Sequence, residues 1–461
     1  MTRTFPSSSA SRRFYAAVWR WHFMIGVLVI PFLFLLAFSG LLMLLSKPLD
    51  SVLNESLLTV KVGEQSLPVT VLLESVEQHY PQASVKLYLP PEAEDQSAKF
   101  SLQPHSHAGH GGHHGSSTLV YLNPYTGEIL GDQDPAASLY SRIKTFHGSL
   151  FMGSLGDALI EIAAGLAVLM IVSGLYLAWP KGGERPPATA KKAGQREGWR
   201  RWHLSLGWLI ALPLLFFLVS GLAWTNIWGG KIVQPWGSLP GTTYKATQAV
   251  ETEQKTERSP VTDHAAMNEA GLHRVPWAVE QVPMPESASG EATLQLDEVV
   301  ALAAHQGLEH FRVHFPQGDS GVWTVSATTI AGDIENPTGE RIVHLGQHSG
   351  QVLQDIRFAD YPVMGKAMAA SIPLHQGDLG LWNWLLNLLL VCLIMALIVT
   401  GALLWWKRQS RRAPPKAERA PARAVAVIML VVALAFPLSA AALLGIILLD
   451  VVLTARKAAK A

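Results

Sequence analysis

Two apolar stretches that repeat each other determine the architecture of this chain. The first, from Trp19 to Gly40, reads WRWHFMIGVLVIPFLFLLAFSG, and the second, from Arg200 to Gly221, reads RRWHLSLGWLIALPLLFFLVSG. Each has Arg-Trp-His, a glycine four residues after the histidine, and Ser-Gly 17 and 18 residues after it. Each is long enough for a helix to cross the bilayer, which takes about 20 apolar residues. A match of this length predicts a tandem repeat of membrane helices.

The overall composition supports a membrane protein. Of 461 residues, 15% are charged and 49% hydrophobic, whereas an ordinary soluble domain has about 25% charged residues. A soluble enzyme is therefore excluded. The single cysteine also excludes a disulfide framework, a Cys-ligated iron–sulfur cluster and a covalently attached haem. The uncharged runs that predict five transmembrane helices are 23–45, 162–179, 204–230, 379–406 and 424–449.

Basic residues are concentrated in the short segments between these runs. Residues 181–201 carry seven Lys or Arg against two acidic residues, 407–423 carry seven against one, and 1–20 carry four against none. The long segments are acidic, with six basic and eleven acidic residues in 46–146, and nine and eighteen in 231–378. Because short basic loops stay in the cytoplasm, we expect the N-terminus and short loops inside and the long segments outside.

The long segments also repeat each other. Val85–Leu89 and Phe311–Phe315 alternate like strands, and each follows a stretch of helical spacing. Each long segment is therefore predicted to form a small α+β module with an antiparallel sheet. The expected order is 1–45 (tail and first helix), 46–146 (first outer module), 147–180 (second helix), 181–201 (loop), 202–230 (third helix), 231–374 (second outer module), 375–406 (fourth helix), 407–423 (loop) and 424–453 (fifth helix).

As a set, these motifs resemble the PepSY-associated transmembrane family over nearly the whole chain. The resemblance rests on the Arg-Trp-His-x3-Gly starts, the histidines His147 and His375 before the second and fourth helices, the Ser/Thr-Gly motifs followed by Trp, and the Tyr/His-Leu-x3-Thr/Ser-Gly-x-x-Leu strands. It implies a helical bundle in the bacterial inner membrane with two periplasmic PepSY-like modules. It also implies b-type haem and electron transfer to periplasmic ferric chelates, because the best-understood members reduce siderophore iron.

Each of the four repeat-related helices has one histidine at or before its start. Ionisable groups in membrane helices tend to be functional. His22 and His203 begin helices that run outward, whereas His147 and His375 begin helices that run inward. The topology therefore predicts two pairs at two depths. Two imidazoles facing each other across a porphyrin make a six-coordinate site suited to electron transfer. We accordingly expect two haems b, with these four side chains as axial ligands.

Two other interpretations of the four histidines are open. Interfacial His, like Trp, can lie at the headgroup level without a ligand. A zinc or copper site is the other competitor, although neither pair has the third and fourth ligands that such metals usually take.

Several further residues are candidates for supporting roles. Arg20 and Arg201 precede the inner histidines and either pair with haem propionates or anchor the helices at the cytoplasmic face. Asp157 and Glu161 share one helix face, and interfacial capping is favoured over proton handling. A Gly-rich loop is predicted to bind Cu, Zn or Ni weakly; its histidines are His105, His107, His110, His113 and His114. Surface positions are expected for His310, His314, His344 and His348.

The residues favour a dihaem inner-membrane protein, and the family resemblance implies that it reduces ferric chelates. No cytoplasmic segment has room for a flavin- or nicotinamide-binding unit of about 30 residues, so the donor is expected to be a quinol or a separate protein. Membrane lipid is a partner and nucleic acid is not. The alternatives are a membrane protein that handles periplasmic Cu, Zn or Ni, and a haem-free PepSY module that binds or regulates another protein.

Overall fold

The structure is a computed structural model, and it divides the chain into two compact units. The helical unit comprises 1–42, 144–234 and 386–461, and the sheet unit comprises 43–143 and 235–385. We describe each unit by itself. The residues that the structure describes are 9–104, 117–179, 195–233, 267, 275–280, 282–290, 292–408 and 422–458.

Four helices among the described residues are long and apolar enough to cross a membrane. They are α1 (Ser9–Leu53), α5 (Gly153–Ala178), α6 (Gln195–Leu222) and α9 (Leu381–Trp406). Their common interior is apolar, with Val29, Leu166, Ile210 and Ile394 packed together. A short helix, α4 (Leu139–Ser149), precedes α5, and a single π-helical turn, η2 (Trp228–Val233), follows α6. The four spans match the first four apolar runs of the sequence.

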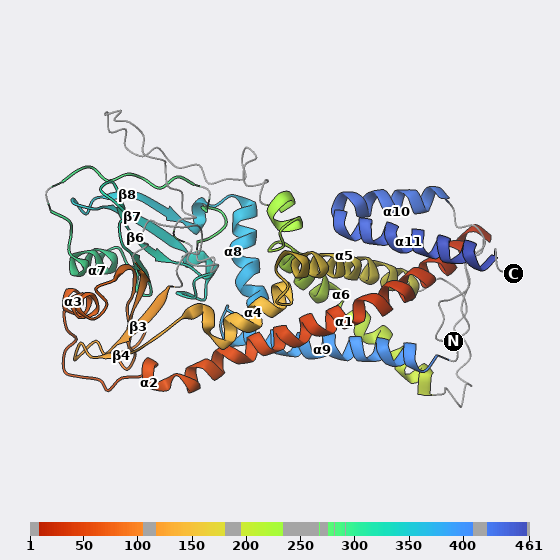
Figure 1. Ribbon diagram of the computed structural model, residues 1–461, viewed down its shortest axis with the longest axis horizontal. Coiled ribbons are helices and arrows are strands. Elements are labelled where there is room, and N and C mark those ends of the chain that lie inside the picture. Colours follow the sequence, from red (N-terminus) through yellow and green to blue (C-terminus); the bar gives the residue numbers. More distant parts are fainter. Residues whose placement is uncertain are drawn as a thin grey trace. The chain divides into compact units, whose positions relative to one another are not determined.

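The fifth apolar run does not form the single helix expected over 424–453. It forms two helices, α10 (Ala422–Ala435) and α11 (Pro437–Ala458), which lie against each other (Figure 1). The break follows from Pro437, which lacks an N–H and disfavours helical backbone at the residue before it. The hydroxyl of Ser439 on α11 donates to the carbonyl of Ile162 on α5 at 3.1 Å. A Cβ at Gly165 would lie 2.2 Å from that hydroxyl oxygen, so this glycine permits α11 to pack on α5.

The sheet unit contains one continuous antiparallel sheet rather than two separate ones. Its eight strands have the order β4-β3-β2-β1-β5-β6-β7-β8. The strands are β1 (Ala83–Leu89), β2 (Ala98–Pro104), β3 (Thr118–Leu122), β4 (Ile129–Gln133), β5 (Arg312–His314), β6 (Val322–Ala327), β7 (Arg341–Gly346) and β8 (Val352–Arg357). The helical elements of the unit are α2 (Glu55–Leu58), η1 (Pro135–Ala137), α3 (Val69–His79), α7 (Leu296–His305), η5 (Pro337–Gly339), η6 (Phe358–Asp360) and α8 (Val363–Gln376).

The two α+β halves meet where β1 pairs with β5. Tyr88 lies opposite Val313 at this junction, and Leu87 lies opposite His314. On one side Tyr88 pairs with Phe100 of β2, and on the other Val313 pairs with Val325 of β6. The ladder at the junction is short, but both of its neighbouring ladders are longer. The expected antiparallel α+β halves are therefore present, and they share their sheet.

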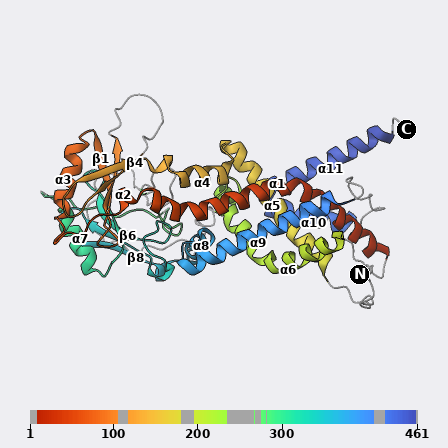
Figure 2. The same cartoon turned by 90° about the horizontal axis from the view of Figure 1, so that it is seen from below.

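Helices α3 and α7 touch each other in the sheet unit (Figure 1), and Figure 2 shows both at its left. Their apolar sides pack into the core that lines one sheet face. Asp297 of α7 accepts hydrogen bonds from the backbone N–H groups of Val69 and Thr70, at 2.6 and 2.9 Å. These are unsatisfied donors at the start of α3. Burial raises the pKa of Asp297, but the bonds from Thr70 and Val69 outweigh it and lower the pKa below its usual value. One carboxylate thus joins the two halves.

The other sheet face is polar and largely buried, which corrects the expectation for two histidines. His314 and His344 are buried, not at the surface, whereas His310 is exposed and His348 is half-buried. Alternation places them on the face away from the α3–α7 core. The interpretation as surface residues was wrong because this second face is also covered, including by apolar residues of 275–282 and Ala369 of α8.

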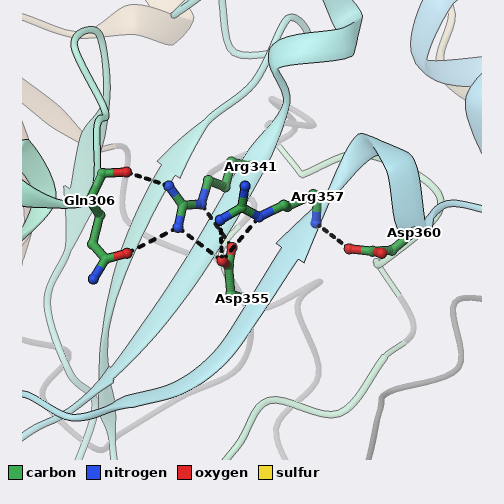
Figure 3. A network of polar contacts seen from close by, with 5 residues as sticks. All are labelled: Gln306, Arg341, Asp355, Arg357 and Asp360. Atoms are coloured by element: carbon green, nitrogen blue, oxygen red, sulfur yellow. Dashed lines mark hydrogen bonds and ion pairs between the residues drawn. The ribbon is translucent and has the colours of Figure 1, made fainter.

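Arginine–carboxylate networks stabilise strands β5, β7 and β8. Arg341 binds Asp355 through Nε and Nη2, at 2.8 and 2.9 Å, and donates to Gln306 at the end of α7 (Figure 3). Arg357 adds two bonds to the same carboxylate. Burial raises the pKa of Asp355, but the hydrogen bonds from Arg341 and Arg357 prevail and lower it. A deeper pair joins Arg312 to Asp333, with side chains 5% and 6% exposed.

Candidate functional site

The imidazole of His22 on α1 lies against the Ser-Gly motif of α5. Its Nδ1 is 3.0 Å from the hydroxyl oxygen of Ser173. A Cβ at Gly174 would be only 3.0 Å from the ring carbon Cε1, so the absence of a side chain there lets the ring edge approach the helix. The Ser-Gly motif of α5 is therefore the contact site of this histidine. We call the arrangement a histidine socket, meaning a hydroxyl group near Nδ1 and a glycine against Cε1.

The repeat-related histidine has the same surroundings in the second half. His203 on α6 has its Nδ1 3.1 Å from the hydroxyl oxygen of Thr400 on α9. A Cβ at Gly401 would be 3.4 Å from Cε1 of this ring. The two histidines are close enough to interact electrostatically. The structure thus brings together the two members of the predicted inner pair, each on a separate helix.

His147 has a third socket of the same kind, at another level of α1. It lies on α4, not at the start of the membrane helix α5, because the backbone breaks at Leu150 and Phe151, which have positive φ. Its Nδ1 is 2.9 Å from the hydroxyl oxygen of Ser39, and a Cβ at Gly40 would be 3.6 Å from its Cε1. Ser39 follows His22 by 17 residues on α1, which is about 26 Å along a helix. This separation fits two sites at two depths.

His375 lies in the sheet unit, near the end of α8. The helix ends at Gly377, whose φ of 82° is left-handed, and Lys47 then pairs with Asp378. Asn383 is buried and donates to the carbonyl of Leu374 at 3.1 Å. His375 therefore has a fixed position in its own unit. Its partnership with His147 stays a prediction from the repeat.

The donor set of the inner pair fits a haem better than a bare metal ion. A haem takes two axial imidazoles, whereas zinc usually takes four protein ligands or three and a water. No group of three or more His, Cys, Asp or Glu that could hold a metal lies together in the described parts of the chain. The histidines His105, His107, His110, His113 and His114 lie outside the described residues.

A basic residue that the sequence reasoning missed contacts the residues beside His22. The guanidinium of Arg408, just after α9, stacks over the rings of Trp19 and Phe23, at 5.2 and 4.8 Å from the ring centroids. Its Nη1 is buried and has no hydrogen-bond partner among the described residues. These two aromatic residues flank His22 closely in α1. A guanidinium nitrogen without a hydrogen-bond partner here fits an acidic group such as a haem propionate.

The predicted propionate partners are less well placed. Arg20 and Arg201 lie two residues before His22 and His203 in continuous helices, and residues two apart do not share a helix face. Arg201 is exposed. A propionate contact for either residue stays a prediction. The two-residue spacing, which is visible in the sequence, already argues against a contact on the same helix face as the histidine.

Asp157 and Glu161 bind backbone groups. Asp157 accepts from the N–H of Asn226 at 3.1 Å, and Glu161 accepts from the N–H groups of Ile227 and Trp228 at 3.3 and 3.0 Å. These donors belong to the turn that follows α6. The two carboxylates therefore hold this turn against α5, which gives them a structural role.

The four apolar helices and the separate antiparallel sheet define a multi-pass membrane protein with a large extramembrane part. The family model described as the PepSY-associated TM region matches residues 19–408. The chain therefore belongs to this family, as the repeated motifs predicted. The comparison with curated proteins gave no match.

Proposed function

We propose that this protein is a dihaem b-type electron-transfer protein of the bacterial inner membrane that reduces periplasmic ferric chelates. The observation that carries the proposal is the repeated histidine socket, found at His22, His203 and His147. Haem bound there would supply a one-electron Fe(III)/Fe(II) couple. Family membership supports a membrane protein of this architecture, and the histidines support the cofactor.

Each histidine pair has a defined role in this proposal. His22 on α1 and His203 on α6 would hold the inner haem, and Nη1 of Arg408, which has no hydrogen-bond partner among the described residues, would be available to a propionate. From the repeat, His147 and His375 would hold the outer haem. A haem held by two imidazoles would supply one-electron transfer rather than an open binding position for substrate. Val29 and Ile210 belong to the apolar core of the helical unit, which would limit the access of water to a haem held between its helices.

The family resemblance supplies the proposed substrate class, and the chemistry of one-electron reduction accounts for the release of iron. Siderophores bind Fe(III) through hard oxygen ligands, which hold the softer Fe(II) far less tightly. One electron passed to the chelated Fe(III) gives Fe(II), and the chelate then releases the metal. The positive-inside pattern assigns the sheet unit to the periplasm, where it would meet the chelate. A membrane quinol or a separate protein would supply the electrons.

Two experiments test the cofactor and the activity. A pyridine haemochrome spectrum of the purified protein should give about two haems b per chain, and a haem-free preparation from haem-sufficient cells would contradict the proposal. Protein reduced with dithionite and freed of excess reductant should then be reoxidised by a ferric siderophore, with Fe(II) captured by a chromogenic chelator. The His22→Ala, His203→Ala double variant is the matched control. It should lack the inner haem and therefore pass fewer electrons to the ferric siderophore per chain.

Orientation is tested by labelling single cysteines in a Cys392→Ser background. A membrane-impermeant maleimide applied to spheroplasts should label a cysteine at Gln347 and not one at Ala188, in the basic loop between α5 and α6. The reverse pattern would contradict the periplasmic assignment of the sheet unit. The same method applied after α11 decides the side of the C-terminus.

The metal-handling alternative rests on the His-rich loop around His110, and the regulatory alternative rests on the sheet unit alone. Both predict a preparation without haem. Equilibrium dialysis with Zn²⁺ or Cu²⁺ separates them, because only the first predicts metal binding that is lost when residues 105–114 are replaced by Gly and Ser.

A further inference from the structure

We propose that the hydroxyl groups of Ser173, Thr400 and Ser39 are positioning residues. They hold His22, His203 and His147 in the tautomer that carries hydrogen on Nδ1, so that Nε2 is the atom presented to iron. The same hydrogen bond then sets part of each haem's midpoint potential. The effect on the midpoint potential rests on the proposed haem function, whereas the histidine tautomer concerns this chain alone.

The direction of the hydrogen bond follows from counting protons on the hydroxyl. A serine or threonine hydroxyl has one hydrogen to donate. In a helix that hydrogen often goes to a carbonyl three or four residues earlier. The distances from hydroxyl to carbonyl oxygen are 3.0 Å for Ser173 to Met170, 2.8 Å for Thr400 to Leu397 and 2.6 Å for Ser39 to Leu35.

Because the hydroxyl hydrogen is used within its own helix, the hydroxyl oxygen must accept from the imidazole. The donor is then the Nδ1–H of His22, His203 or His147, at 3.0, 3.1 and 2.9 Å. A neutral imidazole carries hydrogen on only one nitrogen. With Nδ1 protonated, the lone pair of Nε2 is available for a metal.

The hydroxyl also affects the electron density of the ligand. A hydrogen bond donated by the distal nitrogen of a metal-bound imidazole raises the basicity of the ligating nitrogen. A more basic ligand favours Fe(III) over Fe(II) and lowers the midpoint potential. A hydroxyl is a neutral acceptor, so it gives part of this effect while leaving the imidazole with its proton. Removing it should raise the potential of that haem alone.

Thr400 offers the sharpest test, because valine copies its shape without the hydroxyl and serine restores the hydroxyl. We expect Thr400→Val to retain both haems and to shift the midpoint potential of the inner haem to more positive values in a spectroelectrochemical titration. Thr400→Ser should titrate like the wild type. An unchanged inner potential in Thr400→Val, or an equal shift in both variants, would overturn the tuning role.

The tautomer is tested separately on the haem-free chain. Solid-state ¹⁵N spectra of protein labelled at histidine, with His203→Gln used to assign the signal, should show Nδ1 of His203 protonated and Nε2 unprotonated. The opposite tautomer in the wild type would overturn the proposal even if haem binds. A protein that lacks haem but shows the Nδ1–H tautomer would contradict the proposed function and leave the positioning role intact.

Discussion

Histidine meets a hydroxyl group in two regions of this molecule, and the two arrangements differ in what they fix. In the helical unit His203 pairs with Thr400, whose hydroxyl donates to Leu397 in its own helix. In the sheet unit His344 of β7 pairs with Thr324 of β6, with Nδ1 2.8 Å from the hydroxyl oxygen. A strand places no carbonyl three or four residues back within reach of the hydroxyl.

The difference shows that secondary structure, more than residue type, decides the direction of such a bond. On a helix the backbone takes the hydroxyl hydrogen, and the histidine must donate. On the strand no helical carbonyl takes the hydroxyl hydrogen of Thr324, so this hydroxyl is able to donate to Nδ1 of His344 or to accept from it. Thr324 and His344 are cross-strand neighbours in the ladder, and both are fully buried. We therefore assign them to sheet packing and assign the helical pairs to ligand orientation.

The largest expected effect separates these two groups of histidines. His203→Ala should remove the inner haem and leave about one haem per chain, because one missing axial ligand opens the site. His344→Ala should leave the haem content unchanged. Pyridine haemochrome assay per mole of protein measures both, and loss of haem from the sheet variant would break the comparison.

The outer ligands give a matched test of pairing. His147→Ala and His375→Ala should each remove the same haem, and the double variant should lose no more than either single one, because ligands of one iron act as a unit. If His147→Ala kept both haems while His22→Ala removed both, a single shared site would replace the two-depth arrangement.

The next effect concerns the stability of the sheet unit. Arg312→Ala leaves Asp333 as a buried charge without its partner, and breaking such a pair destabilises a fold by about 3–5 kcal/mol. Arg357→Ala removes an exposed partner of Asp355 and should change stability by less than about 1 kcal/mol. Urea unfolding followed by tryptophan fluorescence measures the two variants. The haem spectrum should stay that of the wild type in both.

A smaller, pH-dependent effect is expected at Glu340, which is buried in the sheet unit beside the hydroxyl of Tyr361. Burial raises the pKa of Glu340 from 4.5 to about 7. A raised folded-state pKa means that stability is fully present below about 4.5 and falls as the pH rises toward about 7.

Glu340→Gln removes this titration, since its amide oxygen can still accept from the N–H and hydroxyl of Thr329. At pH 8 the variant should be more stable than the wild type by up to about 3 kcal/mol, and it should unfold at a higher temperature. Near pH 4.5 the two proteins should be equally stable. A constant difference between the two proteins across this range would refute the assignment.

The smallest effect distinguishes the glycines of the sockets. Gly174→Ala places a Cβ 3.0 Å from Cε1 of His22, tighter than ordinary contact, whereas Gly40→Ala places one 3.6 Å from His147, an ordinary van der Waals distance. We expect Gly174→Ala to broaden or shift the inner haem's spectrum and Gly40→Ala to leave the outer one unchanged. Equal changes in the two variants would mean that ring contact does not govern ligand orientation.

The sequence predicted the elements that depend on local pattern. Four long apolar runs became four helices, and alternating residues became strands. The break in the predicted fifth helix was missed because hydropathy outweighed Pro437, although a proline within an apolar run is itself a break signal. Burial of His314 and His344 could not be predicted, because alternation indicates which face a residue occupies and not whether that face is covered.

Sequence reasoning singled out the four histidines, whose role as haem ligands stays a prediction, and it missed the hydroxyl groups beside three of them. The four histidines stood out because they recur in the repeat. The Ser-Gly and Thr-Gly motifs recur equally, at Ser39, Ser173 and Thr400, but in the sequence they served only as markers of that repeat. Their chemical meaning needed the neighbouring helix, since the residues that meet lie up to 197 positions apart in the chain.

The junction of β1 and β5 also determines how the two halves are related to each other. A single cross-strand row runs from Val120 through Phe100 to Tyr88, meets Val313, and continues through Val325 to Val343. Equivalent residues of the two halves face each other at its centre, which is where the symmetry axis of an isologous dimer would pass. The pairing of the two halves therefore has the form of an isologous dimer interface within one polypeptide. Each half also has a segment without counterpart in the other, the His-rich loop in one and residues 242–290 in the other.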